Sequence, residues 1–232
     1  MSLADVVVCD TNAHKKYFEN KFNIPQRKLK VIPVGVNTEE FKPTLITPNT
    51  GKFIVGFYGS FIPLHGTKFI VEAAKILSGY QDIHFTLIGE GFEFKQTKTL
   101  ALDTYGLTNI SFPGWVDYAS LNDHIASFDI ALGIFGETLK TDLVIPNKIF
   151  HYAALQKAII TKVSPAIREI FEDGVNLILT DSNPEKIAES ILELYTNCEQ
   201  KNRIAVNGYD KVSKGYNHIE TAKKLIQLAC RL

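Results

Sequence analysis

The chain has 232 residues, of which 45% are hydrophobic and 22% charged, a composition typical of a soluble α/β domain with a sizeable core. Its 25 basic residues (Lys and Arg) balance 25 acidic ones, so the net charge is zero with histidine neutral, which argues against broad electrostatic binding to nucleic acid or an anionic membrane. Three widely spaced cysteines, apolar runs too short to span a bilayer and the lack of a visible signal peptide fit a reducing cytoplasm.

Apolar, β-branched runs alternate with helical patterns along the chain. The predicted strands are residues 6–9, 29–33, 53–58, 84–88, 110–112, 130–135, 158–161 and 177–179. The predicted helices are residues 12–22, 67–77, 92–105, 121–127, 147–155, 165–171 and 184–195, followed by two Lys-rich helical segments. Near-continuous hydrophobic strands separated by helices predict a doubly wound, Rossmann-like parallel sheet, which binds ligands at the carboxyl ends of its strands.

Residues 1–36 do not continue this alternation. They read as one strand–helix–strand piece, joined to the rest through VIPVGVNTEEFKPTL, a stretch with two prolines, a glycine and no helical period. We interpret this piece as part of another, mostly missing domain, and residues 37–215 as one Rossmann-like domain. Residues 216–232 are expected to form a helix that packs back toward the N-terminal domain.

The first loop at the predicted carboxyl edge is FYGSFIPLHGTKF. Gly59 lets the backbone approach a ligand closely, and Gly66 opens the next helix with free N–H groups. Ser60 adds a hydrogen-bond donor, and His65 adds a donor or a charge. The alternative is a tight strand-to-helix turn with no ligand.

The second and third loops are LIGEGFEF and SFPGWVDYASL. Gly89 gives a sharp exit from a buried strand, and Glu90 either contacts a ligand or caps the next helix. A dinucleotide fingerprint needs a third glycine near Phe94, and the sequence has none there, so it argues against a nicotinamide cofactor. Trp115 is a candidate to flank a base, the alternative being a core or rim aromatic.

The fourth loop, LVIPNKIFHYAAL, combines a helix start with a cation. Pro146 is preorganised for the first helical turn, and the free N–H groups that follow attract anions. Lys148 beside them favours a phosphate, while His151 lies one turn further along. Upstream, Glu137 follows a flexible glycine. The alternative is a solvated helix start with a satisfied core histidine.

Other chemistries find no support in the sequence. There is no D-x-D, no H-E-x-x-H and no close Cys/His cluster, so no metal ligands are predicted. No G-x-S-x-G elbow is present for a Ser-His-Asp triad.

Several stretches, in order, resemble the family 4 (group 1) retaining glycosyltransferases with the GT-B fold. VIPVGVNTEEFKP is similar to their interdomain linker, GSFIPLHGTKFIVEAAKIL to their first loop and helix, and LIGEGFEF to their G-x-G turn. NISFPGWVDYASL and IPNKIFHYAALQKAIIT are similar to their later segments. The resemblance covers nearly the whole chain and implies the C-terminal, nucleotide-sugar-binding half of a two-domain enzyme, with residues 1–36 as the last piece of the acceptor domain.

The resemblance also implies roles for individual residues. The residues expected to surround the donor diphosphate are Gly59, Ser60, His65, Gly66, Pro146, Asn147, Lys148 and Ile149. Those expected around the base are Gly89, Glu90, Trp115 and Val116, with His151 toward the ribose and Glu137 near the donor sugar. The expected catalytic residues are Lys148, Glu137 and His65, with Lys148 and a protonated His65 stabilising charge on the leaving diphosphate. The chain departs from the family where many relatives carry Arg (Ser60), Lys (His65) or a paired glutamate (His151).

The implied reaction is transfer of a sugar from a nucleotide-diphosphate sugar to a saccharide or lipid-linked acceptor, with retention and without a metal or other cofactor. The acceptor, and any membrane contact, would depend on the missing domain. Three alternatives stay open at this point: a non-catalytic nucleotide-sugar-binding module, a nucleotide-sugar epimerase of the same fold, and a dinucleotide-dependent oxidoreductase.

Overall fold

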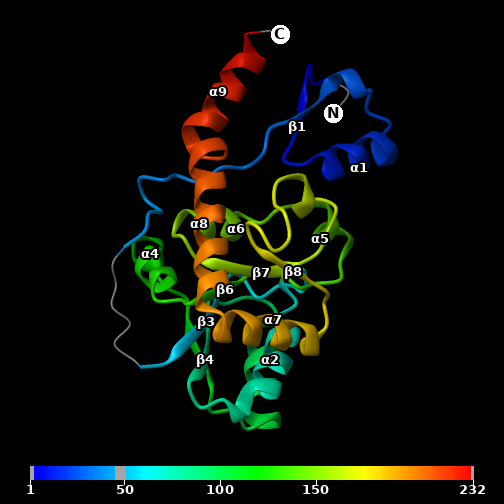
Figure 1. The fold of residues 1–232 in the computed structure, drawn as a ribbon. Helices are drawn as coiled ribbons and strands as arrows, with labels where there is room; N and C mark the ends of the chain where they lie inside the picture. Colours follow the sequence, from blue (N-terminus) through cyan, green and yellow to red (C-terminus); the bar gives the residue numbers. More distant parts are fainter. Residues whose placement is uncertain (1–2, 45–50, 231–232) are drawn as a thin grey trace.

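The computed structural model describes residues 3–44 and 51–230, so part of the polar break expected at 42–51 lies outside the described residues. Its main body is a parallel sheet in the order β5-β4-β3-β6-β7-β8 (Figure 1). The strands are β3 (Phe53–Tyr58), β4 (Ile83–Ile88), β5 (Ile110–Gly114), β6 (Ile130–Leu132), β7 (Ala158–Lys162) and β8 (Ile178–Thr180). The predicted doubly wound α/β fold is confirmed.

Helices cover both faces of this sheet. One face packs against α2 (Thr67–Ile76), α3 (Phe94–Thr99) and α7 (Pro184–Thr196), and the other against α4 (Tyr118–Ala126) and α6 (Asn147–Ala154). The long α8 (Cys198–Gly215) contributes side chains to both hydrophobic clusters. Successive residues of β3 belong to opposite clusters, Val55 to one and Ile54 to the other. Because both faces are buried, the strands read as continuous apolar runs.

The N-terminal piece forms its own small unit. Strands β1 (Val7–Cys9) and β2 (Leu29–Val31) pair in parallel, and α1 (Asn12–Phe22) connects them with the turn η1 (Gln26–Lys28). The C-terminal helix α9 (His218–Ala229) rises beside this unit (Figure 1).

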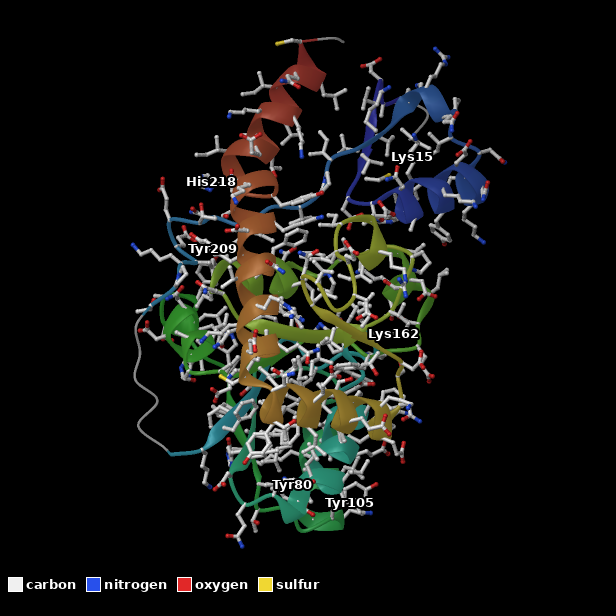
Figure 2. All side chains as sticks on the ribbon, in the orientation of Figure 1. Lys15, Tyr80, Tyr105, Lys162, Tyr209 and His218 are labelled. Carbon is white, nitrogen blue, oxygen red and sulfur yellow. The ribbon has the colours of Figure 1, made fainter. Side chains whose placement is uncertain are left out.

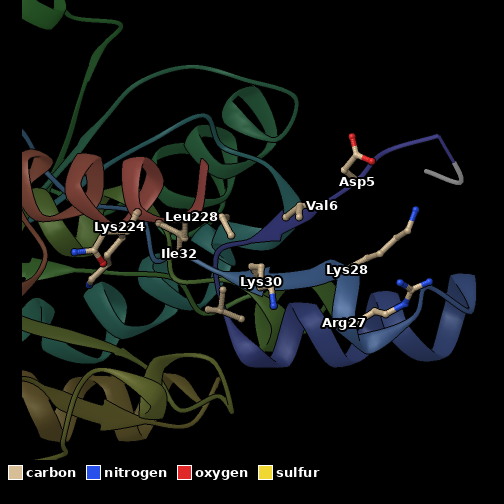
Figure 3. Close-up of a pocket in the computed structure, with 10 residues that line it drawn as sticks. Asp5, Val6, Arg27, Lys28, Lys30, Ile32, Lys224 and Leu228 are labelled. Carbon is tan, nitrogen blue, oxygen red and sulfur yellow. The ribbon is translucent and has the colours of Figure 1, made fainter. Parts of the chain in front are cut away.

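The described residues that follow β2, 32–44, form what we call the crossover segment. This segment connects the N-terminal unit to α9, and the unit and α9 also line a common cavity. Val36 donates a backbone hydrogen bond to Tyr216 and accepts one from His218, which Figure 2 labels at the start of α9. A cavity of about 600 Å³ lies between α9 and the unit (Figure 3). Its lining residues are Asp5, Val6, Arg27, Lys28, Lys30, Val31, Ile32, Lys224, Gln227 and Leu228. The division into domains, including the packing of residues 216–232 toward an N-terminal domain, stays a prediction.

Some predicted elements differ in extent. The helix predicted at 165–171 is wrong: only the turn η5 (Ile167–Glu169) forms, with the amides of Glu169 and Ile170 donating to carbonyls three residues back, the 3₁₀ pattern. The strand predicted at 130–135 ends at residue 132, where the hydroxyl of Thr161 accepts from the amide of Ile134 and interrupts the regular ladder. The helix predicted at 92–105 is divided into α3 and a π-helical turn, η4 (Leu100–Thr104).

Three further short elements complete the fold. They are α5 (Leu139–Leu143), which was not predicted, and the turns η2 (Pro63–His65) and η3 (Leu77–Gly79). Among the helices within the described ranges, none combines the length and apolar character needed to cross a membrane. The cytoplasmic location stays a prediction.

One carboxylate joins the N-terminal unit to the main body. Glu169, in η5, accepts the backbone N–H groups of Asn12 and Ala13, each at 2.7 Å, and the side-chain amide of Asn12 at 2.9 Å. A carboxylate at a helix N-terminus satisfies orphan donors and interacts favourably with the helix dipole. Nearby, the hydroxyl of Thr11 donates to the carbonyl of Leu143 at 2.5 Å. Glu169 therefore caps α1 from another part of the fold.

Replacing Glu169 with alanine is expected to lower the free energy of unfolding by about 1 kcal/mol, the usual size of a lost helix cap. Hydrogen exchange at the amides of Asn12 and Ala13 should accelerate, since both lose their acceptor. The matched control is Glu172→Ala, which removes an exposed glutamate three residues away. Equal exchange rates in the two variants would show that the contact does not hold α1.

Candidate functional site

A cavity of about 340 Å³ lies where β3, β4 and β5 end. It is lined by residues from the loops that follow these strands and from α4: Tyr58, Gly59, Ser60, Ile88, Gly89, Glu90, Trp115, Val116, Tyr118 and Leu121. We call it the edge cavity. It brings together all of the residues that were expected around the base, together with Gly59 and Ser60. The rings of Trp115 and Tyr118 are 66% and 60% exposed, so both are accessible to a planar ligand.

Two glycines let the loops around the edge cavity touch through their backbones. A Cβ atom on Gly89 would lie 2.0 Å from the carbonyl oxygen of Gly59, and one on Gly91 would lie 1.9 Å from that of Ser60. Both glycines have positive φ angles, of 119° and 148°. The glycines of the second loop therefore serve the close approach of two loops, which sets the shape of the cavity.

The variant Gly89→Ala is expected to destabilise the protein by about 1–3 kcal/mol beyond the cost of a positive φ, because the new methyl group overpacks the contact with Gly59. The control is Gly106→Ala, where φ is +60° and the added Cβ atom would have no neighbour within 4 Å. Chemical denaturation measures the difference, and equal losses in both variants would contradict the tight contact.

Lys148 lies beneath the first loop, on α6. The side chain is only 4% exposed, and its Nζ atom lies 3.9 Å from the centre of the Phe57 ring. A Cβ atom on Gly59 would lie 2.6 Å from this Nζ, so the missing side chain of Gly59 leaves room for the amine. Nζ has no hydrogen-bond partner among the described residues. Burial holds the pKa of Lys148 well below its ordinary value.

His65, at the end of η2, faces the same side of Gly59 as the Lys148 amine: a Cβ atom on Gly59 would lie 2.8 Å from its ring. Its ring is 6% exposed, and its Nδ1 atom has no hydrogen-bond partner within the described chain. Burial is the main cause that lowers the pKa of His65 to about 2, and the nearby Lys148 amine adds to this effect whenever it is charged. The expected charge on a protonated His65 is therefore not supported. A neutral ring can still exchange one hydrogen bond with a ligand.

The start of α6 offers fewer free amides than expected. Pro146 precedes the helix in an extended conformation, and Asn147 is exposed. The amide of Ile149 donates to the carbonyl of Pro146 at 3.0 Å and its side chain is fully buried, so neither group is free here, and the expected contact from Ile149 stays a prediction. The amides of Asn147 and Lys148 have no acceptor in the described part of the chain. The groups at the start of α6 that remain available to an anion are thus the amides of Asn147 and Lys148 and the buried amine of Lys148.

His151 is held by its neighbours. Its ring stacks on Phe41, with centroids 3.8 Å apart, and its Nδ1 lies 2.6 Å from the hydroxyl of Tyr58. Phe41 also meets Tyr118 edge-to-face, and the hydroxyl of Tyr118 donates to Glu40 at 3.1 Å. The ring does not line the edge cavity. The structure therefore places His151 between the crossover segment and a wall of the cavity, which matches the core-histidine alternative better than a free ribose ligand.

The buried histidines should make stability depend on pH. Burial lowers the pKa of His151 to about 4 and contributes to that of about 2 for His65, against 6.5 in the unfolded chain. The unfolded state then binds more protons, so stability should fall as the pH drops below 6.5, by up to about 1.4 kcal/mol per pH unit for each histidine. His151→Gln should make this slope shallower between pH 6.5 and 4. An unchanged slope in urea unfolding would contradict the burial of a neutral ring.

Glu137 and Gly66 lie on a separate cavity. This cavity, of about 370 Å³, opens between α2, α3 and the segment before α5, and Glu137 is exposed at its wall. A Cβ atom on Gly66 would collide with the backbone of residues 135 and 136, so Gly66 is needed for packing. Lys162, labelled in Figure 2, fixes the segment by donating to the carbonyl of Gly136 and pairing with Asp142. Glu137 and Gly66 are therefore both absent from the lining of the edge cavity.

Sequence reasoning missed three aromatic residues of the site: Tyr58, Tyr118 and Phe41. Tyr58 is the last residue of a predicted strand, a position that faces the carboxyl edge, so the pattern could have indicated it. Nothing in the sequence pairs Phe41 with His151. In the described part of the chain, no group of three or more His, Cys, Asp or Glu side chains could hold a metal ion.

Comparison with known proteins defines the class. The sequence pattern of the family described as "Glycosyl transferases group 1" matches residues 52–197, and the chain belongs to this family. An uncharacterized glycosyltransferase of Methanocaldococcus jannaschii is 28% identical over 88% of this chain and 54% of its own length. The GPI3 subunit of the Saccharomyces cerevisiae phosphatidylinositol N-acetylglucosaminyltransferase is 21% identical over 97% of the chain and 50% of its own length. The chain spans about half the length of these relatives.

Solved structures agree with the fold. Anabaena HepE in complex with UDP-glucose has a TM-score of 0.86 at 16% identity, covering 99% of this chain and 64% of HepE. The C-terminal domain of LpcC, a group 1 glycosyl transferase of Francisella tularensis, has a TM-score of 0.69 at 26% identity, covering 79% of this chain and all of that domain. The GT-B glycosyltransferase fold predicted from the sequence is confirmed.

Proposed function

We propose that this chain is the donor-binding half of a glycosyltransferase, which transfers a sugar from a nucleotide-diphosphate sugar to an acceptor, with retention and without a metal ion. One observation carries the proposal: the amine of Lys148 is buried directly below Gly59, beside the edge cavity, and has no partner among the described residues. A buried cationic group normally has a counterion. A diphosphate at the start of α6 would supply it, with the free amides of Asn147 and Lys148 as further donors.

The edge cavity would then hold the nucleoside. The exposed rings of Trp115 and Tyr118 offer stacking surfaces, and Glu90 offers a carboxylate to hydroxyl or ring N–H groups. Uracil is the base we propose, because the structures of HepE contain UDP and UDP-glucose. In the reaction, Lys148 would stabilise the charge that develops on the leaving diphosphate. Glu137 would lie beyond the diphosphate, on the side of the donor sugar.

The acceptor would bind in a cleft completed by a further domain. We propose that residues 1–36 belong to that domain, that residues 37–215 form the donor domain, and that residues 216–232 return to the acceptor side. The hydrogen bonds of Val36 with Tyr216 and His218, and the cavity that α9 and the N-terminal unit line together, support this division. The acceptor would be a saccharide or a lipid-linked molecule, and the enzyme would work in the cytoplasm.

Calorimetric titration of the chain with UDP, GDP and ADP, each with and without Mg²⁺, tests the proposal. We expect one-to-one binding of UDP, with the same affinity in the presence and absence of Mg²⁺. Binding of none of the three would contradict a donor site in this chain, and a strict need for Mg²⁺ would contradict the metal-free mechanism. The nucleotide that binds most tightly identifies the base.

A non-catalytic nucleotide-sugar-binding module is the second candidate. One feature of His151 favours it. Many family members carry a glutamate at this position, whereas here the histidine ring is held between Phe41 and Tyr58. Such a module would bind UDP but never turn over. Product formation from a UDP-sugar by the longer protein, followed by NMR of the anomeric proton, separates the two and reports retention directly.

A further inference from the structure

Among the residues that the structure describes, the buried amine of Lys148 has no partner that could keep it charged. Its Nζ is enclosed by the rings of Phe57 and Tyr58, 3.9 and 5.7 Å from their centres, and by the backbone of Gly59. No salt bridge or hydrogen bond to this atom exists within the described residues. The ring faces favour a cation, but they replace water poorly, and an isolated charge is costly in such a place.

The titratable groups around Lys148 do not supply the missing charge. They are Tyr58 on β3, His65 on η2, and His151 and Tyr152 on α6. The two tyrosines are buried and their pKa values are raised, so both are neutral. The two histidines have lowered pKa values and are neutral as well. Among the carboxylates before α6, Asp142 pairs with Lys162, and Glu137 is exposed.

We propose that Lys148 is neutral in the empty site and takes up one proton from solvent when a nucleoside diphosphate binds. This inference rests on the proposed function, since the diphosphate is the anion that would create the charge. Each binding event then converts one amine and one solvent proton into an ammonium group paired with phosphate oxygens. The lowered pKa of Lys148 in the empty protein agrees with this starting state.

The coupling has a consequence for the donor. An amine that becomes charged only beside a diphosphate increases the affinity for ligands that carry a diphosphate, and adds little to the affinity for a nucleoside alone. It also makes donor affinity depend on pH, because one proton is consumed for each molecule bound. Affinity should therefore fall as the pH rises above the pKa of the empty site. An ordinary exposed lysine, already charged at pH 8, would show no such fall.

Isothermal titration of UDP into the chain at pH 8.0, in two buffers of different ionisation enthalpy, counts the protons directly. This pH is about two units above the pKa of the terminal phosphate of free UDP, so the phosphate is already deprotonated and contributes few protons. We expect about one proton taken up per UDP bound. We also expect an affinity about tenfold weaker for each further pH unit. UDP binding without proton uptake would overturn the coupling and leave the proposed function intact, whereas absence of UDP binding would overturn both.

Two variants assign the proton to its residue. His65→Gln keeps the buried amine and should retain the uptake of one proton, even if the affinity changes. Lys148→Met removes the amine, and any residual UDP binding, measured at high UDP concentration, should proceed without proton uptake. Loss of the uptake in His65→Gln, or its persistence in Lys148→Met, would show that another group takes up the proton and would overturn the assignment. Circular dichroism confirms that each variant is folded.

Discussion

Replacing Lys148 with methionine is expected to weaken UDP binding roughly 100-fold, the usual effect of removing one member of a buried charged pair. The same change should make the empty protein more stable, by about 1–4 kcal/mol, because an apolar chain of similar length suits the surroundings of Phe57 better than an unpaired amine. Titration calorimetry and chemical denaturation measure the two effects. Opposite changes in binding and stability are characteristic of a residue kept for function.

The matched control is Lys140→Met, the same substitution at an exposed position on α5. It should change neither UDP affinity nor stability measurably. A Lys148→Met protein that binds UDP as tightly as the parent would contradict the role of this amine. A strongly destabilised Lys148→Met protein would show instead that the amine has a structural partner.

Replacing Phe41 with alanine is expected to cost about 3–5 kcal/mol of stability, the usual range for a buried phenylalanine. Phe41 is 2% exposed and packs against both His151 and Tyr118. Its loss would detach the crossover segment from the main body. Because Tyr58 and Tyr118 line the edge cavity, UDP affinity should fall as well.

Phe92→Ala provides the comparison, since this ring is 89% exposed. Its effect on the free energy of unfolding should stay within about 0.5 kcal/mol. Partial rescue of Phe41→Ala by Phe41→Leu would show that buried volume matters most. If Phe41→Ala lowered stability but left UDP affinity unchanged, the crossover segment would be independent of the site.

The sequence was sufficient to predict the doubly wound sheet, and it led to the proposal of a site at the carboxyl edge of that sheet. Strands buried on both faces leave continuous apolar runs, and the loops after such strands gather at one edge by topology alone. Gly59, Gly89 and Lys148 could be identified because their residue types are unusual at those points of the pattern. Their neighbourhood in space followed from the parallel order of the strands, which the structure confirms.

The sequence could not predict contacts between distant segments. The stacking of Phe41 on His151 and the capping of α1 by Glu169 join residues more than 100 positions apart, and no local pattern encodes either pair. The sequence could not predict that His65 is neutral either, because its pKa depends on burial, which is a property of the folded state. The helix predicted at 165–171 is only a short 3₁₀ turn, since the amides of Glu169 and Ile170 donate to carbonyls three residues back.

The most direct test of the account is a crystal structure of this chain with bound UDP. We expect the diphosphate within hydrogen-bond distance of the Nζ of Lys148 and of the free amides at the start of α6, with the base in the edge cavity beside Trp115. A diphosphate bound elsewhere, with the amine of Lys148 still unpaired, would contradict the central claim that this buried lysine is the anchor of the donor site.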